Sequence, residues 1–218
     1  CYSNPKVRKL LVDTLLAYVQ KKPFVDFLHV WLADAKNNQC ECEECQKMHP
    51  SDWYVMLLNE VDEALTEIGS DMRIVLIQYM ETIRPPQEVK LKNPKRFVLT
   101  SAIGQFYEEG YPTKEFTGEL PPYERNNFKM VEPELRIKWH NEWKKWCGNI
   151  PSFVFEYRFW TDMYCDLGQM RISKETHRDM KQLKKIGLQG CMNDQTHRMY
   201  MPTSLPCILM GEMLFDTA

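Results

Sequence analysis

The stretch Phe27-Leu28-His29-Val30-Trp31-Leu32-Ala33 decides how we interpret the fold of this chain. It is apolar almost throughout, which is typical of a strand buried on both faces of a parallel sheet. Asp34 follows it directly, and the thiol-rich segment Cys40-Glu41-Cys42-Glu43-Glu44-Cys45 comes next. The stretch therefore predicts a core strand whose carboxyl end leads into chemically active side chains.

Similar apolar runs recur along the chain, and segments with helical periodicity separate most of them. Strands are predicted over residues 72–79, 96–102, 153–158 and 188–193. Helices are predicted from Pro5 to the stop at Lys21-Lys22-Pro23, over 51–68 with Ser51 and Asp52 as its cap, around Trp139, Trp143 and Trp146, over 173–186, and over 203–215. The step from 79 to 96 lacks an obvious helix and passes through Pro85-Pro86. Alternation of apolar strands with helices indicates a parallel sheet in an α/β fold.

The strand count favours part of a barrel. A (β/α)8 barrel has eight strands, whereas about five are predicted here, and the chain begins with a helix. We therefore expect one domain over residues 1–218 that forms the C-terminal part of a TIM-like barrel and lacks its N-terminal strands. An open parallel α/β sheet is the alternative. Residues 104–133 are rich in Gly, Pro, Tyr, Glu and Asn, and a loop of this length is usually functional.

Composition narrows the class of protein. The 218 residues are 44% hydrophobic and 27% charged, with a net charge of −2, as in an ordinary globular domain without a nucleic-acid or anionic-membrane partner. No apolar run approaches the roughly 18 residues of a membrane span. The first residue is Cys1 rather than Met, so we expect a processed product or a fragment. Scattered cysteines behave as small buried hydrophobes and favour a reducing, cytoplasmic compartment.

Carboxylates, amides and aromatic residues gather where the predicted strands end. Aromatic faces stack on sugar rings, and carboxylates or amides hydrogen-bond to vicinal hydroxyls, so this pattern predicts a carbohydrate site. Glu156 and Asp34 are the candidate catalytic pair, since burial of Glu156 would raise its pKa toward that of a proton donor. The candidate sugar-binding residues are Trp31, Gln78, Tyr79, Tyr157, Trp160, Asp194 and His197. Alternatively, Glu156 forms a buried ion pair with Arg158, and Asp34 caps the turn toward Asn37-Asn38.

The thiol-rich segment suits a zinc site. Cys40, Cys42, Cys45 and His49 form a C-x-C-x2-C-x3-H pattern that can supply four zinc ligands. A structural zinc ion would fix this loop beside Asp34. Free thiols or one disulfide are the alternatives. A catalytic thiol is disfavoured, because the neighbouring glutamates would raise the thiol pKa. His140 and His177 fall on predicted helices and are expected at the surface.

Several of these motifs together resemble a known family. They are Ser3-Asn4-Pro5-Lys6-Val7-Arg8, Val30-Trp31 to Asp34, Cys40 to Cys45, Ser51-Asp52-Trp53-Tyr54 with Asn59-Glu60, Phe155-Glu156-Tyr157, and Gly187-Leu188-Gln189-Gly190 to Arg198, followed by Pro202-Thr203. The chain resembles the bacterial domain-of-unknown-function family 4838 over essentially its whole length. This resemblance implies a glycoside-hydrolase-like TIM barrel, related to the α-glucuronidase and hexosaminidase type. It also implies a segment upstream of this chain.

The implied barrel assigns each predicted strand a position among the eight strands of the fold. If the last strand is the eighth, Asp34 follows the fourth and Glu156 lies on the seventh, where many retaining glycosidases carry their two carboxylates. The Asn-Glu pair common on the fourth strand of that clan is absent. We therefore expect a glycoside hydrolase with a carboxylate pair at the barrel mouth. A non-catalytic carbohydrate-binding or scaffold domain and a zinc-dependent hydrolase are the alternatives, and the pattern does not indicate an oligomeric state.

Overall fold

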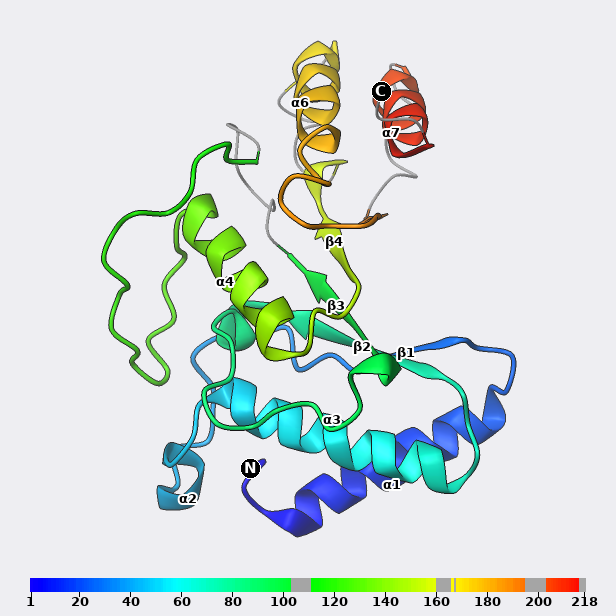
Figure 1. The fold of residues 1–218 in the computed structure, drawn as a ribbon, viewed down its shortest axis with the longest axis vertical. Coiled ribbons are helices and arrows are strands. Elements are labelled where there is room, and N and C mark those ends of the chain that lie inside the picture. The colour runs from blue at the N-terminus through cyan, green and yellow to red at the C-terminus, as the bar shows by residue number, and fades with distance from the viewer. Residues whose placement is uncertain (103–110, 160–165, 167, 195–202, 216–218) are drawn as a thin grey trace. The chain divides into compact units, whose positions relative to one another are not determined.

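The computed structural model describes residues 1–102, 111–159, 166, 168–194 and 203–215. Helices and strands alternate along this part of the chain (Figure 1). The helices are α1 Pro5–Lys21, α2 Glu43–Gln46, α3 Pro50–Glu67, α4 Pro133–Trp146, α6 Met170–Met180 and α7 Leu205–Phe215, with short 3-10 turns η1 Met80–Thr82 and η2 Pro94–Arg96. The strands are β1 Phe27–His29, β2 Arg73–Gln78, β3 Phe97–Ser101, β4 Ser152–Glu156 and β5 Cys191–Asn193.

The strands form one five-stranded sheet in the order β1-β2-β3-β4-β5. β1 pairs in parallel with β2, and β4 pairs in parallel with β5 in the register Glu156↔Asn193. The prediction of an α/β fold is confirmed. Strand order equal to chain order occurs along the wall of a (β/α)8 barrel and also in an open sheet wound in one direction, so both expected architectures fit it.

Strand β1 is shorter than residues 27–33. Its last bond to β2 joins the Val30 N–H to the Val75 carbonyl. Beyond this point the buried Tyr54 hydroxyl accepts a hydrogen bond of 3.0 Å from the Ile77 N–H and donates one to the Val30 carbonyl. The side chain thus replaces the ladder and ends the strand. Phe27 and His29 are exposed, so β1 is a half-exposed edge strand and not the doubly buried strand that its apolar sequence predicted.

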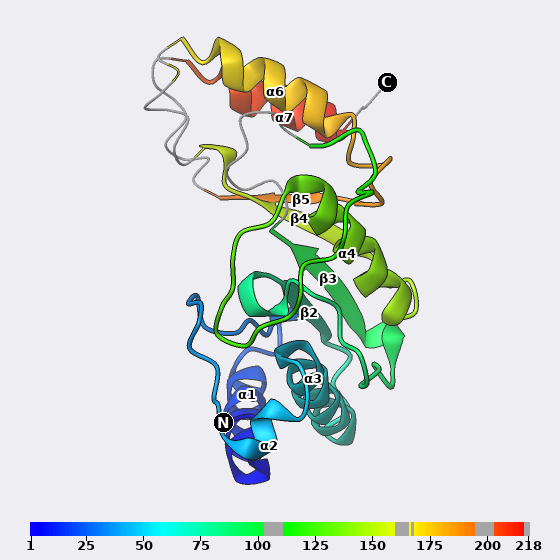
Figure 2. The same cartoon turned by 90° about the vertical axis from the view of Figure 1, so that its left-hand side faces the viewer.

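The chain divides into two compact units, and each has its own core. The first unit comprises Cys1–Leu99, Gly118–Met130 and Glu142–Pro151. Within it α1 packs on α3, as Figure 2 shows. The core of this unit combines α3 residues such as Leu58 and Leu65 with residues of β2 and β3 and with Trp143. Asn4 caps α1 by accepting a hydrogen bond of 2.9 Å from the Lys6 N–H, as the Asn-Pro start predicted.

Helix α3 begins at Pro50, before the predicted cap. Asp52 is buried in the first turn and accepts hydrogen bonds of 2.8–3.2 Å from three consecutive backbone N–H groups, those of residues 87–89. About two turns further along α3, the Asn59 side chain donates a hydrogen bond to the Lys90 carbonyl and accepts one from the Lys92 N–H. Asp62 then pairs with Arg96 at 2.7 Å. These side chains hold the extended connection between β2 and β3 against α3, which explains why no crossover helix is needed there.

The second unit comprises Thr100–Thr117, Val131–Asn141 and Ser152–Ala218. Its core includes Val154 of β4, Ile172 and Met180 of α6, and Met210 of α7, and α6 lies beside α7 (Figures 1 and 2). Helix α6 begins three residues before Ser173, the predicted start, and the Ser173 hydroxyl donates 2.6 Å back to the Gln169 carbonyl.

The prediction that His140 lies at the surface is wrong. It is fully buried in the second unit, where Nδ1 lies 2.6 Å from Ser101 Oγ and Nε2 lies 3.2 Å from Ser152 Oγ. Within the described ranges, no helix combines the length and apolar character needed to cross a bilayer.

Candidate functional site

The predicted residues of the first unit lie at the end of β2 and in the segments that follow β1 and β2. Asp34 is exposed, and its Oδ1 accepts a hydrogen bond of 3.0 Å from the Tyr79 hydroxyl. Trp31 and Tyr79 are half-buried against the core of this unit. Gln78 is buried, and its Nε2 donates 2.9 Å to the Ile83 carbonyl. Asp34, Tyr79 and Trp31 can therefore face a ligand, whereas the amide of Gln78 supports the turn after β2.

Glu156 ends β4 in the second unit and is fully buried. Its Oε1 lies 3.4 Å from Arg158 Nη2, and the same nitrogen contacts Asp179 Oδ2 at the shorter distance of 2.9 Å. Asp179 also accepts hydrogen bonds of 3.1 Å from the Tyr111 N–H and from Arg178 Nε. The ion pair of Arg158 with Asp179 is therefore closer than its ion pair with Glu156.

This arrangement sets the protonation of Glu156. Burial raises the pKa of the Glu156 carboxyl, the charge of Arg158 opposes that rise, and the negative charge of Asp179 adds to it. Among the described residues, Glu156 Oε2 has no hydrogen-bond partner although it is buried. A carboxyl in this environment holds its proton at a higher pH than an exposed glutamate does. The expected buried ion pair with Arg158 is present, but it is long and shared.

The neighbouring strand places an amide beside this carboxyl. Asn193 is the β5 partner of Glu156 in the parallel register, so their side chains leave the sheet on the same face. Neither Nδ2 nor Oδ1 of Asn193 has a partner among the described residues, although both atoms are buried. The backbone N–H of Asp194 donates 2.8 Å to the Glu156 carbonyl. Buried polar atoms of two neighbouring side chains thus have no partner among the described residues, which is what a site for a polar ligand requires.

Three other predicted sugar-binding residues belong to this unit. Tyr157 is half-buried and packs edge-on against Phe155 with ring centroids 4.8 Å apart. Trp160 and His197 lie outside the described residues. Asp34 and Glu156 belong to different units, and their pairing stays a prediction.

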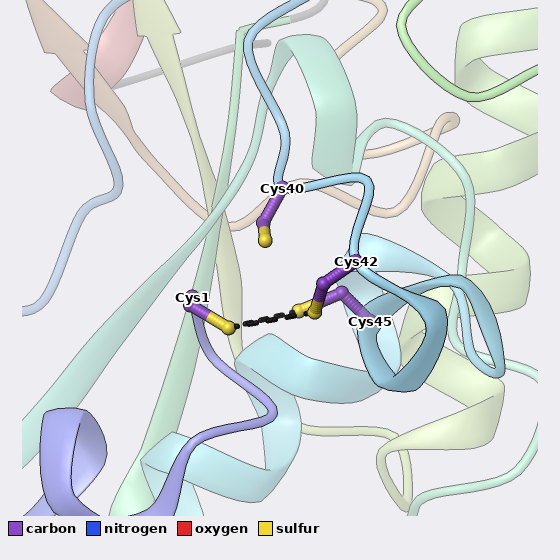
Figure 3. A group of neighbouring side chains, drawn as sticks. All are labelled: Cys1, Cys40, Cys42 and Cys45. Atoms are coloured by element: carbon purple, nitrogen blue, oxygen red, sulfur yellow. Dashed lines mark hydrogen bonds between the residues drawn. The ribbon is translucent and has the colours of Figure 1, made fainter.

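The structure brings four thiols together in the first unit. The sulfur atoms of Cys1, Cys40, Cys42 and Cys45 all lie within 4.8 Å of one another, and all four cysteines are free (Figure 3). Cys1 Sγ lies 3.6 Å from both Cys42 Sγ and Cys45 Sγ. A group with this composition can hold a metal ion.

His49, the predicted fourth ligand, is not in this group. It precedes α3, and its ring stacks on Tyr123 with centroids 4.0 Å apart. Burial lowers the pKa of His49. Cys1 takes the fourth place instead, and sequence spacing alone could not reveal it because Cys1 precedes Cys40 by a whole helix and strand.

Backbone contacts hold the thiol loop in shape. The Arg125 guanidinium donates to three carbonyls, those of Cys40 at 3.2 Å, Cys45 at 2.5 Å and Met48 at 2.7 Å. Asn126 pairs with the backbone of Gln39 through two hydrogen bonds of 2.7 and 2.8 Å. Part of the predicted long excursion, residues 104–133, thus serves to brace the cysteine loop.

The chain was then compared with known proteins. The family described as domain of unknown function DUF4838 matches residues 1–218. The chain belongs to this family. No curated protein and no solved structure matches it. The resemblance expected from the sequence motifs is therefore confirmed for the DUF4838 family, and the chemistry of this DUF4838 chain has to be argued from its own residues.

Sequence reasoning missed two residues of the candidate sites. Asp179 lies on α6, 21 positions after Arg158, and no local pattern connects it with β4. The only indication for Cys1 in the sequence is that it is an additional cysteine shortly before the Asn-Pro start of a helix. Both contacts depend on the packing of elements, which periodicity does not specify.

Proposed function

We propose that this DUF4838 domain is glycoside-hydrolase-like, and that Glu156 donates a proton to the departing oxygen of a glycosidic bond. The observation that carries the proposal is the burial of Glu156 at the carboxyl end of β4, with a raised pKa and with an Oε2 atom that has no hydrogen-bond partner among the described residues. General acids of glycoside hydrolases are carboxyls whose pKa is raised by their surroundings.

The neighbours of Glu156 support this role. Asp179 competes for Arg158, so the guanidinium only partly neutralises Glu156 and the carboxyl can keep its proton. The amide atoms of Asn193, which lack partners within the described part of the chain, can hydrogen-bond to sugar hydroxyls beside that proton. The half-buried ring of Tyr157 offers an apolar face for a pyranose.

The test is a comparison of leaving groups with the full chain. Parent and Glu156→Gln are assayed on a panel of aryl glycosides, in which the pKa of the aryl alcohol is varied, and on natural glycans. If Glu156 is the proton donor, the variant loses about 10²–10⁴-fold in kcat/KM on poor leaving groups. It keeps much more activity on good leaving groups, because these depart without a proton. Glycan binding stays intact.

The matched control is Glu212→Gln, which changes an exposed glutamate on α7 of the same unit. It should behave as the parent on every substrate. If Glu156→Gln equals the parent on every leaving group that the parent cleaves, the proposed role of Glu156 is wrong.

A non-catalytic carbohydrate-binding domain is the second candidate. The shared contact of Arg158 with Glu156 and Asp179 favours it, since such a network also serves to hold β4 against α6. In that case the parent binds glycans and cleaves none of the panel. Glu156→Gln would then change glycan affinity or stability but no rate.

The zinc-dependent hydrolase receives no support from the cysteine cluster. A catalytic zinc keeps one coordination position open for water or substrate. Four thiols that approach one another as these do would fill every position of a tetrahedral ion. We therefore assign any metal in this cluster a structural role.

A further inference from the structure

We propose that Cys1, Cys40, Cys42 and Cys45 bind a single zinc ion in a closed tetrathiolate site. This proposal is independent of the reaction assigned to Glu156, because the residues around the thiols all belong to the first unit and the readout is the metal itself.

The distances between the sulfur atoms agree with a mononuclear site. Four Zn–S bonds of about 2.3 Å at tetrahedral angles place the sulfur atoms about 3.8 Å apart. Cys1 Sγ lies 3.6 Å from Cys42 Sγ and from Cys45 Sγ, and every pair in the group is within 4.8 Å. Figure 3 shows the four side chains turned toward one common region. This space suits one ion rather than a multinuclear cluster.

The ligand set selects a soft tetrahedral ion. Four thiolates favour zinc, whereas magnesium and calcium require oxygen ligands. Binding releases the four thiol protons to solvent, and the resulting complex of Zn²⁺ with four thiolates carries a net charge of −2.

Groups around the thiols suit a bound tetrathiolate. The Cys45 thiol donates a hydrogen bond of 3.1 Å to Ser3 Oγ, which also lies 3.7 Å from Cys42 Sγ. Once metal binding has ionised the thiols, the hydroxyl can donate to thiolate sulfur instead. Arg125 brings its positive charge onto the carbonyls of Cys40 and Cys45. Outer contacts of this kind orient metal ligands and offset their charge.

Contacts with helix α3 also hold the first residues of the chain in place. Arg8 is buried, donates 2.6 Å to the Tyr2 carbonyl and pairs with Glu60 of α3 at 2.7 Å. Trp53 of α3 donates 3.1 Å to the Cys45 carbonyl. Helix α3 therefore anchors both the residue that follows Cys1 and the loop that carries the other three thiols, which prearranges the four ligands.

Metal analysis of the full chain tests the site. The parent, purified under reducing conditions without added metal, should contain about one zinc per chain. Cys1→Ser and Cys42→Ser should each lose most of this zinc to a competing chelator that the parent withstands. His49→Asn and Cys207→Ala should keep it, because neither residue belongs to the group.

A second measurement does not depend on how the serine variants fold. Zinc is removed from the folded parent, and Co²⁺ is titrated back. A closed site gives sulfur-to-cobalt charge-transfer bands and the visible bands of tetrahedral Co²⁺, saturating at one equivalent.

The proposal is overturned if the parent carries no zinc and shows no cobalt–thiolate bands, if iron occupies the thiols, or if the cysteines are isolated as a disulfide. Loss of zinc from His49→Asn, or full retention by Cys1→Ser, would overturn the ligand set.

Discussion

Glu156 shows how one buried residue is balanced between two roles. Desolvation favours its neutral form and Arg158 favours its charged form, but Arg158 lies 2.9 Å from Asp179 and 3.4 Å from Glu156. Asp179 therefore pairs with both Arg158 and Arg178, whereas Glu156 has only the longer contact with Arg158 among the described residues. The more weakly paired carboxyl is the one whose pKa is raised. A neutral acid at the end of a parallel strand is suited to proton donation, whereas a fully paired carboxylate is not.

The raised pKa predicts a specific dependence of stability on pH. Below the pKa of an unfolded glutamate, about 4.3, both the folded and unfolded states are protonated at Glu156. As pH rises above this value, the unfolded state loses the proton first, so the free energy of unfolding falls until pH exceeds the folded-state pKa. Glu156→Gln cannot ionise. Its stability relative to the parent should therefore increase as pH rises above about 4.3, the pKa of an unfolded glutamate.

Denaturant unfolding of both proteins across this pH range measures the effect, with Glu212→Gln as the exposed control. A difference between Glu156→Gln and the parent that stays constant with pH would show that the buried carboxyl is not protonated more readily in the folded state.

At the scale of elements, Tyr54 of α3 defines where β1 stops. Its hydroxyl connects the Val30 carbonyl with the Ile77 N–H, and all of these groups are buried. Tyr54→Phe keeps the ring but leaves a buried donor and a buried acceptor without partners. We expect a loss of about 1–3 kcal/mol in the free energy of unfolding.

Tyr18→Phe is the matched control, because Tyr18 is exposed on α1 and should change stability by less than about 0.5 kcal/mol. Urea unfolding compares the two variants. Equal, small effects would mean that water satisfies the Tyr54 partners and that another contact ends β1.

The α3 motif shows what sequence reasoning could reach. The helix itself follows from its apolar periodicity, and its end follows from Gly69, which adopts a positive φ of 69°. The role of Asp52 does not follow from local pattern. It reads as a helix cap, but its carboxylate is used by three N–H groups more than thirty positions away. Local pattern also misidentified the fourth member of the thiol group. The spacing of His49 fits a metal ligand, but the packing of α1 places Cys1 beside the other three thiols instead.

At the scale of the whole molecule, the two candidate chemistries separate by unit. Glu156, Arg158, Asp179 and Asn193 belong to the second unit, and the four thiols belong to the first. Each unit has its own hydrophobic core. The alternation of strands and helices was predictable because apolar periodicity is local. The division into two cores was not, because it depends on which helices pack together.

This separation predicts which residues lose protection from amide hydrogen exchange when the metal is removed. The described side chains that touch the thiols or brace their loop, including Ser3, Trp53 and Arg125, all belong to the first unit. Chelation should therefore increase amide hydrogen exchange in residues 1–8, 39–54 and 121–128, and leave α6 and α7 close to their original protection, because local opening follows the contacts that are lost.

Hydrogen exchange followed by mass spectrometry, with and without chelator, measures this pattern. Cys42→Ser provides the control, since a chain that has lost the site should not respond further to chelator. Equal deprotection of both units would contradict the prediction, because it would mean that the metal stabilises the chain through contacts other than the cysteine loop. A response confined to the three segments would instead identify the four thiols as a local clamp between the start of α1, the loop before α3, and the segment that carries Arg125.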